Sequence, residues 1–406
     1  MTLLPQFTNE DPRHQAKKRP ITSISSFPEQ IEGVRGVYLH VPFCFHKCHY
    51  CDFYSIVDSR GRQEAFVERL TEELLIVSEL LREPLRTIYV GGGTPTLLSP
   101  GLWETLLSTI QSTLIRGSRV EFSVEANPET VTPELATILV EGGVNRMSVG
   151  AQSFHPVHLK TLERWHDPDN VKRSVDILRQ AGIRSLNLDL IFAIPGQSLE
   201  EALNDLDTAL SLEPDHLSCY DLTYEPNTPM TERLRRGEFQ PATQDLEADM
   251  YRGLCGRLES AGFIQYEISA WAQPDHQCQH NMLYWRNEQW WPVGPGASGH
   301  VAGFRWKNIP RLSVYLDSSG LCQVQDVEFL DEDGRIGEEL MMGLRLREGI
   351  PLSRIDEMLK CGDRAEQRAA AFEKHIGNGL LARRESGLQL TEAGLLLADS
   401  ILVDLI

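Results

Sequence analysis

The sequence is poor in the features that would place a protein in a membrane or on nucleic acid. It contains no run of 18 apolar residues, so no membrane-spanning helix is expected. Its 39 Lys and Arg stand against 58 Asp and Glu, and the net charge of −19 argues against bulk binding to phosphate backbones. Residues 1–20 are polar and lack the apolar core of a signal peptide. We therefore expect a cytoplasmic protein with reduced thiols and no nucleic-acid partner.

Cysteine is sparse, with eight in 406 residues, and unevenly distributed. Thiolates hold cubane iron–sulfur clusters, and a set of three leaves one iron open to an exchangeable ligand. Three cysteines fall in one loop with the spacing C-x3-C-x2-C, directly after an apolar run: Cys44, Cys48 and Cys51. The loop is therefore a candidate site for a reactive 4Fe-4S cluster. The other five are isolated and are expected to be small core residues: Cys219, Cys255, Cys278, Cys322 and Cys361.

Two other uses of this loop compete with a cluster. His46 and His49 lie among the cysteines, so a zinc ion with three cysteine ligands and one histidine ligand is chemically reasonable. Structural zinc sites usually draw on two separated pairs of ligands, and the sequence has no second C-x2-C. A disulfide framework is less consistent than a zinc site with a long chain that has no signal peptide. The residues alone favour a cluster and leave zinc open.

Apolar or β-branched runs alternate with helical patterns through the first part of the chain. In residues 64–81, for example, Phe66, Leu70, Leu74 and Val77 share one helical face. Such alternation implies a parallel sheet with right-handed crossovers. Six units are too few for a closed eight-stranded barrel, so we predict an α/β fold with a partial (β/α)6 barrel. The six expected strands cover residues 36–41, 86–90, 119–125, 145–150, 184–191 and 216–223.

The chain is expected to divide into four regions. Residues 1–34 are polar and contain four prolines, which predicts a flexible N-terminal segment. We assign residues 35–235 to the barrel and residues 236–330 to a small α+β accessory region. Residues 331–406 are mostly helical, with helices expected over 352–359 and 364–376 and a hairpin over 379–391, which predicts a winged-helix-like module. Its residues 351–406 hold seven Lys and Arg against nine Asp and Glu, so no basic face for DNA is expected.

Polar residues gather where the expected strands end. The second strand ends in three glycines and Thr94, which let the backbone expose its N–H groups to a ligand. The next three strands end near Glu125, Gln152 and Asp189. Any one of these is weak evidence, because glycine runs often form turns and strand-end aspartates often cap helices. Together they are expected to surround the cysteine loop, since function in such barrels lies at the C-terminal ends of the strands.

The cysteine spacing, the glycine run and the acidic third strand end resemble the radical S-adenosylmethionine (SAM) superfamily. Within it, the segments YLHVPFC, GGGTPT, SVEANP, SVGAQSF and NLDLIFAIPGQ, all within residues 38–197, resemble the oxygen-independent coproporphyrinogen III oxidase group. The resemblance implies a 4Fe-4S cluster whose open iron is chelated by SAM. It also implies that the SAM site is lined by Tyr38, Tyr50, Gly92, Gly93, Thr94, Glu125, Gln152, Arg164 and Asp189.

Two features separate this chain from the oxidases of that group. The oxidases have a further cysteine two residues after the third, where this chain has Phe53. Residues 280–285 form His-Asn-Met-Leu-Tyr-Trp, which resembles the HNxxYW signature of HemW-type haem chaperones. The resemblance implies that His280 is a haem ligand, with Tyr284 and Trp285 against the porphyrin. In the alternative interpretation, the same cluster locks a loop by hydrogen bonds beneath the barrel opening.

The resemblance implies a haem chaperone that binds haem and passes it to an acceptor apo-protein. The implied partners are haem or a porphyrin, the acceptor and an electron donor, and peripheral contact with a membrane-bound acceptor stays open. The alternative is a radical SAM enzyme that acts on a porphyrin, either by decarboxylating coproporphyrinogen or by opening haem. A third class, a structural iron–sulfur or zinc protein, is distinguished by its iron and sulfide content.

Overall fold

Six parallel strands form the centre of the protein. The computed structural model describes residues 31–81, 83–117 and 119–406, so most of the N-terminal segment expected over residues 1–34 lies outside the described residues. The six strands are hydrogen-bonded side by side in chain order, which confirms the predicted strand–helix alternation. They are β1 (Val34–Val41), β2 (Thr87–Gly92), β3 (Glu121–Ala126), β4 (Arg146–Gln152), β5 (Ser185–Phe192) and β6 (His216–Asp221).

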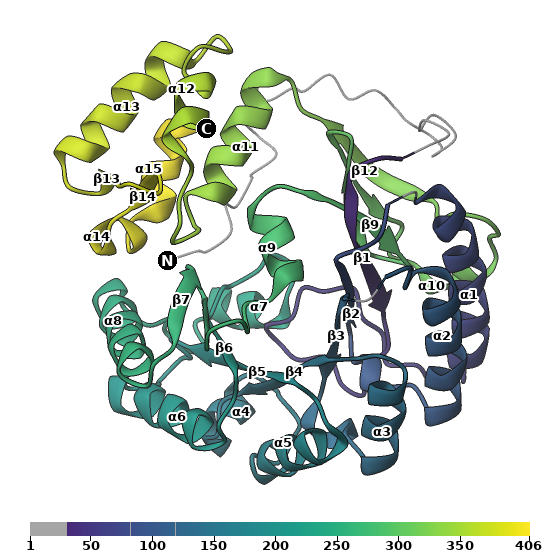
Figure 1. Cartoon of the computed structure of the whole chain (residues 1–406). Coiled ribbons are helices and arrows are strands. Elements are labelled where there is room, and N and C mark those ends of the chain that lie inside the picture. Colours follow the sequence, from purple (N-terminus) through teal and green to yellow (C-terminus); the bar gives the residue numbers. More distant parts are fainter. Residues whose placement is uncertain (1–30, 82, 118) are drawn as a thin grey trace.

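Helices between these strands cover the outside of the curved sheet (Figure 1). They are α1 (Gln63–Leu80), α2 (Pro100–Thr113), α3 (Pro133–Glu141), α4 (Pro156–Thr161), α5 (Asp169–Ala181) and α6 (Leu199–Ser211), with short 3-10 turns η3 (Pro95–Leu97) and η4 (Pro128–Thr130). The predicted apolar face of α1 is confirmed, because its residues Phe66, Leu70, Leu74 and Val77 are all fully buried. An apolar face against the sheet therefore fixes this layer.

The sheet extends beyond the barrel at both edges. After α7 (Pro229–Arg235) and α8 (Gln244–Ser260), strands β8 (Ala270–Ala272) and β7 (Ile264–Glu267) continue it from β6. At the other edge, β9 (Gln289–Val293) pairs parallel to β1 and is followed outward by β10 (Ser298–Val301), β11 (Phe304–Asn308) and β12 (Val324–Phe329). The residues expected as a separate accessory region therefore complete a sheet of twelve strands.

The first described residues already pack against the barrel. Ile31 forms a parallel bridge with Leu81 and is buried, and β1 begins at Val34. On the same side of the molecule, the buried carboxylate of Glu73 on α1 accepts hydrogen bonds from the Tyr315 hydroxyl at 2.8 Å and the Cys322 backbone at 3.0 Å. Helix α1 is thereby tied to the region around α10 (Leu312–Leu316).

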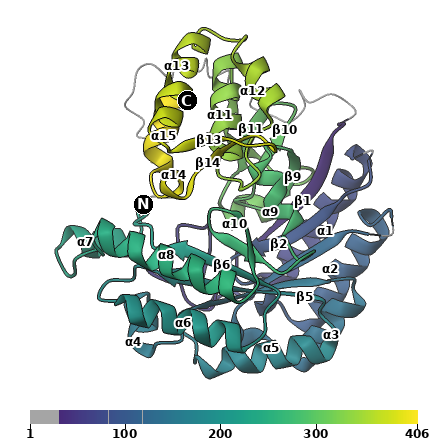
Figure 2. The same cartoon turned by 60° about the vertical axis from the view of Figure 1, so that its left-hand side comes forward.

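The C-terminal module has a small hydrophobic core of its own and lies above the barrel (Figure 2). It contacts α9 (Gln279–Trp285) through α11 (Glu332–Gly343) and β7 through a bridge between Leu346 and Glu267. The two predicted helices and the hairpin are confirmed. The module consists of α11, α12 (Leu352–Met358), α13 (Ala365–Gly377), β13 (Leu381–Arg383), β14 (Leu388–Leu390), α14 (Glu392–Leu395) and α15 (Ala398–Leu405).

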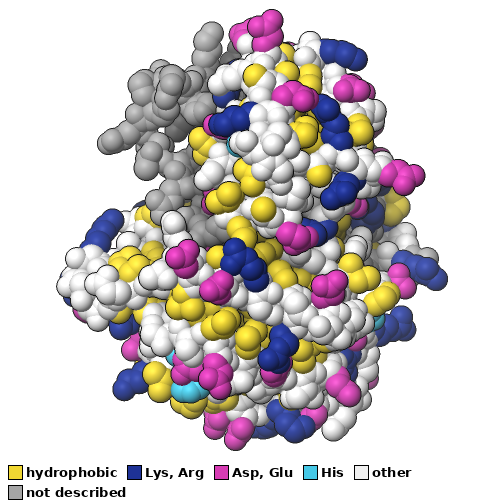
Figure 3. Space-filling model, turned by 90° about the vertical axis from the view of Figure 1, so that its left-hand side faces the viewer, with side chains coloured by type: hydrophobic (Ala, Val, Ile, Leu, Met, Phe, Trp, Pro, Cys, Tyr) yellow, Lys and Arg dark blue, Asp and Glu magenta, His cyan; other side chains and the backbone are white. Residues whose placement is uncertain are grey.

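Two surface properties bear on partners. Among the described residues, no helix is both long enough and apolar enough to cross a bilayer. On the face shown in Figure 3, Lys and Arg side chains are interspersed with Asp and Glu side chains rather than gathered in one field of a single sign.

Candidate functional site

The cysteine loop leaves β1 at its C-terminal end and is fixed by backbone hydrogen bonds along its length. Cys44 N–H donates to Ile56 at 2.8 Å, and His49 N–H donates to Leu162 at 3.2 Å. The backbone N–H of Met230 in turn donates to the carbonyl of His49 at 2.9 Å. The chain just after the loop and two distant segments therefore hold the loop at the opening of the barrel, as expected from the position of the motif after the first strand.

Polar groups from the end of β2 and from the segment after α4 contact the sulfur atoms. The Thr94 hydroxyl lies 3.8 Å from Cys44 Sγ, and a guanidinium nitrogen of Arg164 lies 3.8 Å from Cys48 Sγ. Burial raises the pKa of the Cys44 thiol, and burial raises that of Cys51 to about 12. Metal binding therefore has to remove the protons of these thiols, because only thiolates serve as metal ligands. Donors aimed at the sulfurs then stabilise the thiolate charge.

The three loop sulfurs are not gathered around one point in the way that a single ion requires. Four-coordinate zinc, with zinc–sulfur bonds of about 2.3 Å, brings its sulfur ligands to about 3.8 Å from one another. Within the described residues, the loop cysteines do not form a set of ligand atoms that all lie within 4.8 Å. A four-iron cluster offers a separate iron to each thiolate and accepts wider spacing. The donor set therefore fits the cluster.

The two histidines of the loop have other contacts. The His46 ring stacks on Trp165, with the ring centroids 4.0 Å apart and the planes 5° apart. His49 Nδ1 lies 3.3 Å from a guanidinium nitrogen of Arg233. Neither belongs to a metal-ligand set with the cysteines among the residues that the structure describes. This arrangement does not favour the zinc alternative.

The three consecutive glycines allow close approach between protein groups. A Cβ on Gly91 would lie 2.9 Å from the Glu125 carboxylate, and one on Gly92 would lie 2.7 Å from the His40 ring. At Gly93, a Cβ would lie 2.5 Å from the Phe43 carbonyl oxygen and 3.0 Å from Cys44 Sγ. A side chain at position 93 would therefore push directly on the cysteine loop. The glycines position the loop against the second strand.

Two partly buried carboxylates face the barrel interior from β3 and β5, the strands on either side of β4. Glu125 accepts hydrogen bonds from the Tyr89 hydroxyl at 2.9 Å and from Gly92 N–H at 3.0 Å, and burial raises its pKa to about 7. Asp189 accepts from the Ser148 hydroxyl at 2.8 Å and from the Asn187 amide at 2.7 Å, and burial raises its pKa as well. These carboxylates suit the hydroxyl and ammonium groups of a bound ligand.

The other expected SAM residues lie at the same opening or just below it. Gln152 adopts a left-handed backbone with φ of 65°, and its amide lies with the Arg164 guanidinium over Gly150. Tyr50 packs beside the cysteines in a small apolar cluster. Tyr38 lies deeper, with its ring 6.1 Å from that of Tyr89. Sequence reasoning noted Asn187 beside Asp189 at the end of the fifth strand but did not predict that Asn187 and Ser148 orient this carboxylate.

His280 lies toward the opposite, N-terminal end of the barrel strands. It is 1% exposed on α9, its Nδ1 lies 2.7 Å from the Thr87 hydroxyl, and its Nε2 lies 2.8 Å from the Tyr284 hydroxyl. Burial lowers its pKa to about 3. Both ring nitrogens therefore have partners, as the loop-locking interpretation predicts. Ligation of haem by His280 would require one of these hydrogen bonds to break.

A cavity of about 510 Å³ lies next to α9. Glu121, at the start of β3, fixes the beginning of the helix by accepting from the backbone N–H groups of Gln279 and His280, both at 2.9 Å. The cavity is lined by Thr87, Met282 and Leu283 and by four arginines: Arg86, Arg119, Arg184 and Arg286. Arg86 and Arg184 directly precede β2 and β5, and Arg119 lies two residues before β3. Parallel strands bring their N-terminal ends to one edge, a signal that sequence reasoning did not use.

A parallel barrel with three cysteines after its first strand and a polar opening at the strand ends defines a radical SAM protein. Residues 38–209 match the Radical SAM superfamily and residues 330–397 match the HemN C-terminal domain. When bound, the 4Fe-4S cluster and SAM of this superfamily supply one-electron chemistry. Coproporphyrinogen III oxidase HemN of Escherichia coli has the same fold, with a TM-score of 0.78 at 20% identity over 93% of this chain and 91% of that one.

The chain belongs to the family of the HemW haem chaperones. It is 35% identical to haem chaperone HemW of Lactococcus lactis over 379 residues, which cover 91% of this chain and 97% of that protein. It is 37% identical to haem chaperone HemW of Escherichia coli over 377 residues, which cover 90% and 97%. The resemblance on which the sequence analysis relied is thereby confirmed.

Proposed function

We propose that this protein is a cytoplasmic haem chaperone that binds haem and passes it to an acceptor protein. The observation that supports this most strongly is the match to HemW haem chaperones over nearly their whole length. The chain also lacks the cysteine that the oxidases of the wider group have after the third loop cysteine. Phe53 occupies that position and is 62% exposed at the barrel opening. We therefore propose no decarboxylase activity.

We propose that the haem site is the arginine-lined cavity beside α9. Haem is an apolar disc with two carboxylate-bearing side chains, and guanidinium groups bind carboxylates well. Arg86 pairs with Glu288 and Arg286 pairs with Glu348, whereas no ion pair joins Arg119 or Arg184 to another described residue. These two arginines are available for propionates. Met282 and Leu283 supply apolar surface from α9.

In this proposal, His280 contributes by holding α9 in place. Thr87 lines the cavity and is hydrogen-bonded to Nδ1 of His280. The Thr87 side chain would therefore separate the His280 ring from the haem. The proposed SAM residues at the other end of the barrel bind and orient that cofactor beside the cysteine loop. An electron donor and a haem acceptor are proposed as partners, and a membrane-bound acceptor would be contacted from the surface.

Haem titration of the anaerobically reconstituted protein, followed by its visible absorbance, tests this function. We expect about one haem per chain. Replacing both Arg119 and Arg184 by Glu should weaken haem binding about tenfold, since each removes a charged hydrogen-bond donor. Arg173→Glu, an exposed change on α5, is the matched control and should bind like wild type. Absence of haem binding by wild type, or formation of protoporphyrinogen from coproporphyrinogen III with SAM and electrons, would overturn the chaperone function.

A further inference from the structure

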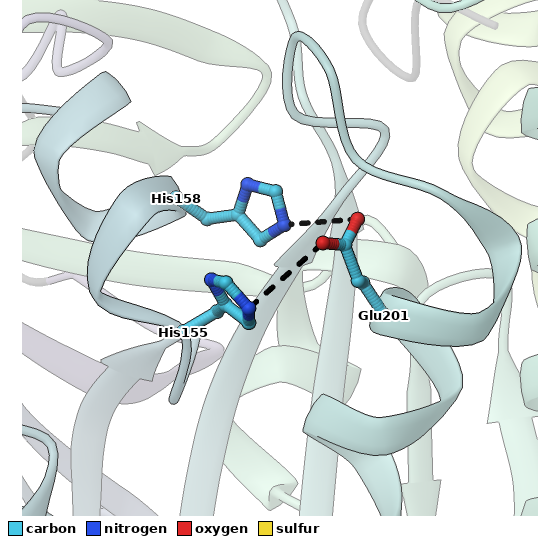
Figure 4. Close-up of side chains that lie close together, drawn as sticks. All are labelled: His155, His158 and Glu201. Carbon is cyan, nitrogen blue, oxygen red and sulfur yellow. Dashed lines mark ion pairs between the residues drawn. The ribbon is translucent and has the colours of Figure 1, made fainter.

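A second cluster of metal-ligating side chains lies outside the barrel opening, between α4 and α6. Figure 4 shows two imidazoles from the start of α4 and one carboxylate from the first turn of α6 pointing toward one another. His155 Nε2 lies 3.8 Å from one carboxylate oxygen of Glu201, and His158 Nε2 lies 3.4 Å from the other. Each residue offers one ligand atom, and these atoms all lie within 4.8 Å of one another.

His158 is the unusual member of this cluster. It is 2% exposed, yet its Nδ1 has no hydrogen-bond partner within the described residues, and its Nε2 has only the 3.4 Å ion-pair contact with Glu201, which lacks hydrogen-bond geometry. Leaving a buried polar group without a hydrogen bond costs about 1–3 kcal/mol, so native proteins rarely tolerate it. The ring is directed at Glu201 (Figure 4). A metal ion between the two side chains would replace this poorly aligned contact with a bond to each of them.

The scaffold around the cluster holds these groups in place. Ser198 donates to Glu201 from its backbone at 2.8 Å and from its hydroxyl at 3.0 Å in a capping box, which orients the carboxylate. Asp205, one turn further along α6, accepts from the Ser153 hydroxyl at 2.6 Å and from Phe154 N–H at 2.7 Å. These bonds fix the chain just before His155. Hydrogen-bonded ligand residues of this kind are typical of metal sites.

We propose that His155, His158 and Glu201 bind a divalent transition metal ion, with zinc as the best match. Two histidines and one carboxylate are a recurrent zinc ligand set, and they leave a fourth position for water. Four-coordinate zinc, with bonds of about 2.0–2.2 Å, needs ligand atoms about 3.3–3.6 Å apart. The 3.4 Å contact already meets that spacing, and small side-chain rotations would bring in His155, which is half-exposed.

Such an ion would connect two helices that follow adjacent barrel strands. The segment after α4 leads directly to Arg164, which contacts Cys48 Sγ, and to Trp165, which stacks on His46. A metal that joins α4 to α6 therefore restrains the segment that supplies Arg164 to the cysteine loop. The site is separate from the three cysteines and does not depend on the proposed haem function.

Zinc titration of the full-length protein, with its cluster reconstituted so that the loop cysteines are occupied, tests this site. We expect one zinc per chain by calorimetry, with binding weakened roughly tenfold or more in His155→Ala and Glu201→Gln. Glutamine keeps the capping box of α6, and His155 is half-exposed, so both variants should fold. Glu200→Gln, the neighbouring exposed residue, is the matched control and should bind like wild type.

The zinc X-ray absorption spectrum identifies the ligands directly. We expect nitrogen and oxygen neighbours at about 2.0–2.2 Å and no sulfur at about 2.3 Å. Sulfur ligation would show that zinc occupies cysteines and would overturn the proposal. Equal zinc binding by wild type, Glu201→Gln and Glu200→Gln, or no zinc binding by any of them, would overturn it as well.

Discussion

The hydroxyl of Tyr284 lies 2.8 Å from Nε2 of His280, four residues earlier on the same helix. Residues four apart are neighbours on a helical surface, so the spacing of histidine and tyrosine in the HNxxYW segment corresponds to one helical turn. The other ring nitrogen is bonded to Thr87 on β2. The segment thus fastens α9 to the barrel and forms one wall of the arginine-lined cavity.

Replacing Tyr284 by Phe should destabilise the haem-free protein by about 1–3 kcal/mol, because Nε2 of the buried His280 loses its partner. Urea unfolding followed by circular dichroism measures this. Tyr224→Phe is the matched control, since the Tyr224 hydroxyl is buried without a hydrogen bond to a described residue and should be nearly neutral. Equal stability of the two variants would show that the bond to His280 contributes little.

Stability should also depend on pH through His280. The folded protein holds its pKa at about 3 because the ring is buried, whereas in the unfolded chain it titrates near 6.5. The unfolded state therefore binds a proton that the folded state rejects, and stability is lost as the pH falls from 6.5 toward 3. At pH 5 the loss is about 2 kcal/mol.

Comparison with His280→Gln isolates this contribution from those of other buried histidines. The difference in free energy of unfolding between wild type and variant should shrink by about 2 kcal/mol between pH 7.5 and pH 5. Urea titrations at the two pH values provide the measurement. A difference that stays constant with pH would mean that His280 titrates alike in both states. Loss of haem binding in this variant without loss of stability would instead identify His280 as a direct haem ligand.

Cys48→Ser should abolish the broad visible absorbance of the anaerobically reconstituted protein while leaving the fold intact. The cysteine is buried beside Arg164 in a loop that backbone hydrogen bonds already fix. Cys255→Ser on α8 is the control and should keep full iron and sulfide content, because that thiol neighbours Tyr251 and Cys219 rather than the loop cysteines. Zinc instead of iron in the anaerobically purified wild type would contradict the cluster.

Sequence reasoning succeeded where local pattern and sheet geometry decide the outcome. The apolar face of α1 and the alternating strands follow from short-range periodicity. Parallel strands then bring Glu125, Asp189 and the cysteine loop to one edge of the sheet. The pairing of β9 with β1 was not predictable in this way. It joins Trp291 to Val37, more than 250 residues apart, and depends on the path of the chain after β6.

The position of α9 escaped prediction for the same reason. Its motif was recognised, but only tertiary structure shows that it lies toward the N-terminal ends of the strands, where Glu121 binds its first backbone N–H groups. The His155–His158–Glu201 cluster likewise combines two helices separated by some forty residues. Single histidines and glutamates on helices are too common to indicate a site until the fold brings them together.

Asp189→Ala should weaken SAM binding by the cluster-loaded protein at least about tenfold, since it removes a charged hydrogen-bond acceptor. Ser148 and Asn187 hold this carboxylate in the barrel interior, so a ligand there meets it in a fixed orientation. Calorimetric titration with SAM measures the affinity. Asp207→Ala, an exposed change on α6, should bind SAM normally, and iron content should be unchanged in both variants. Unchanged affinity in Asp189→Ala would remove this residue from the site and leave Glu125 as the interior carboxylate that meets the cofactor.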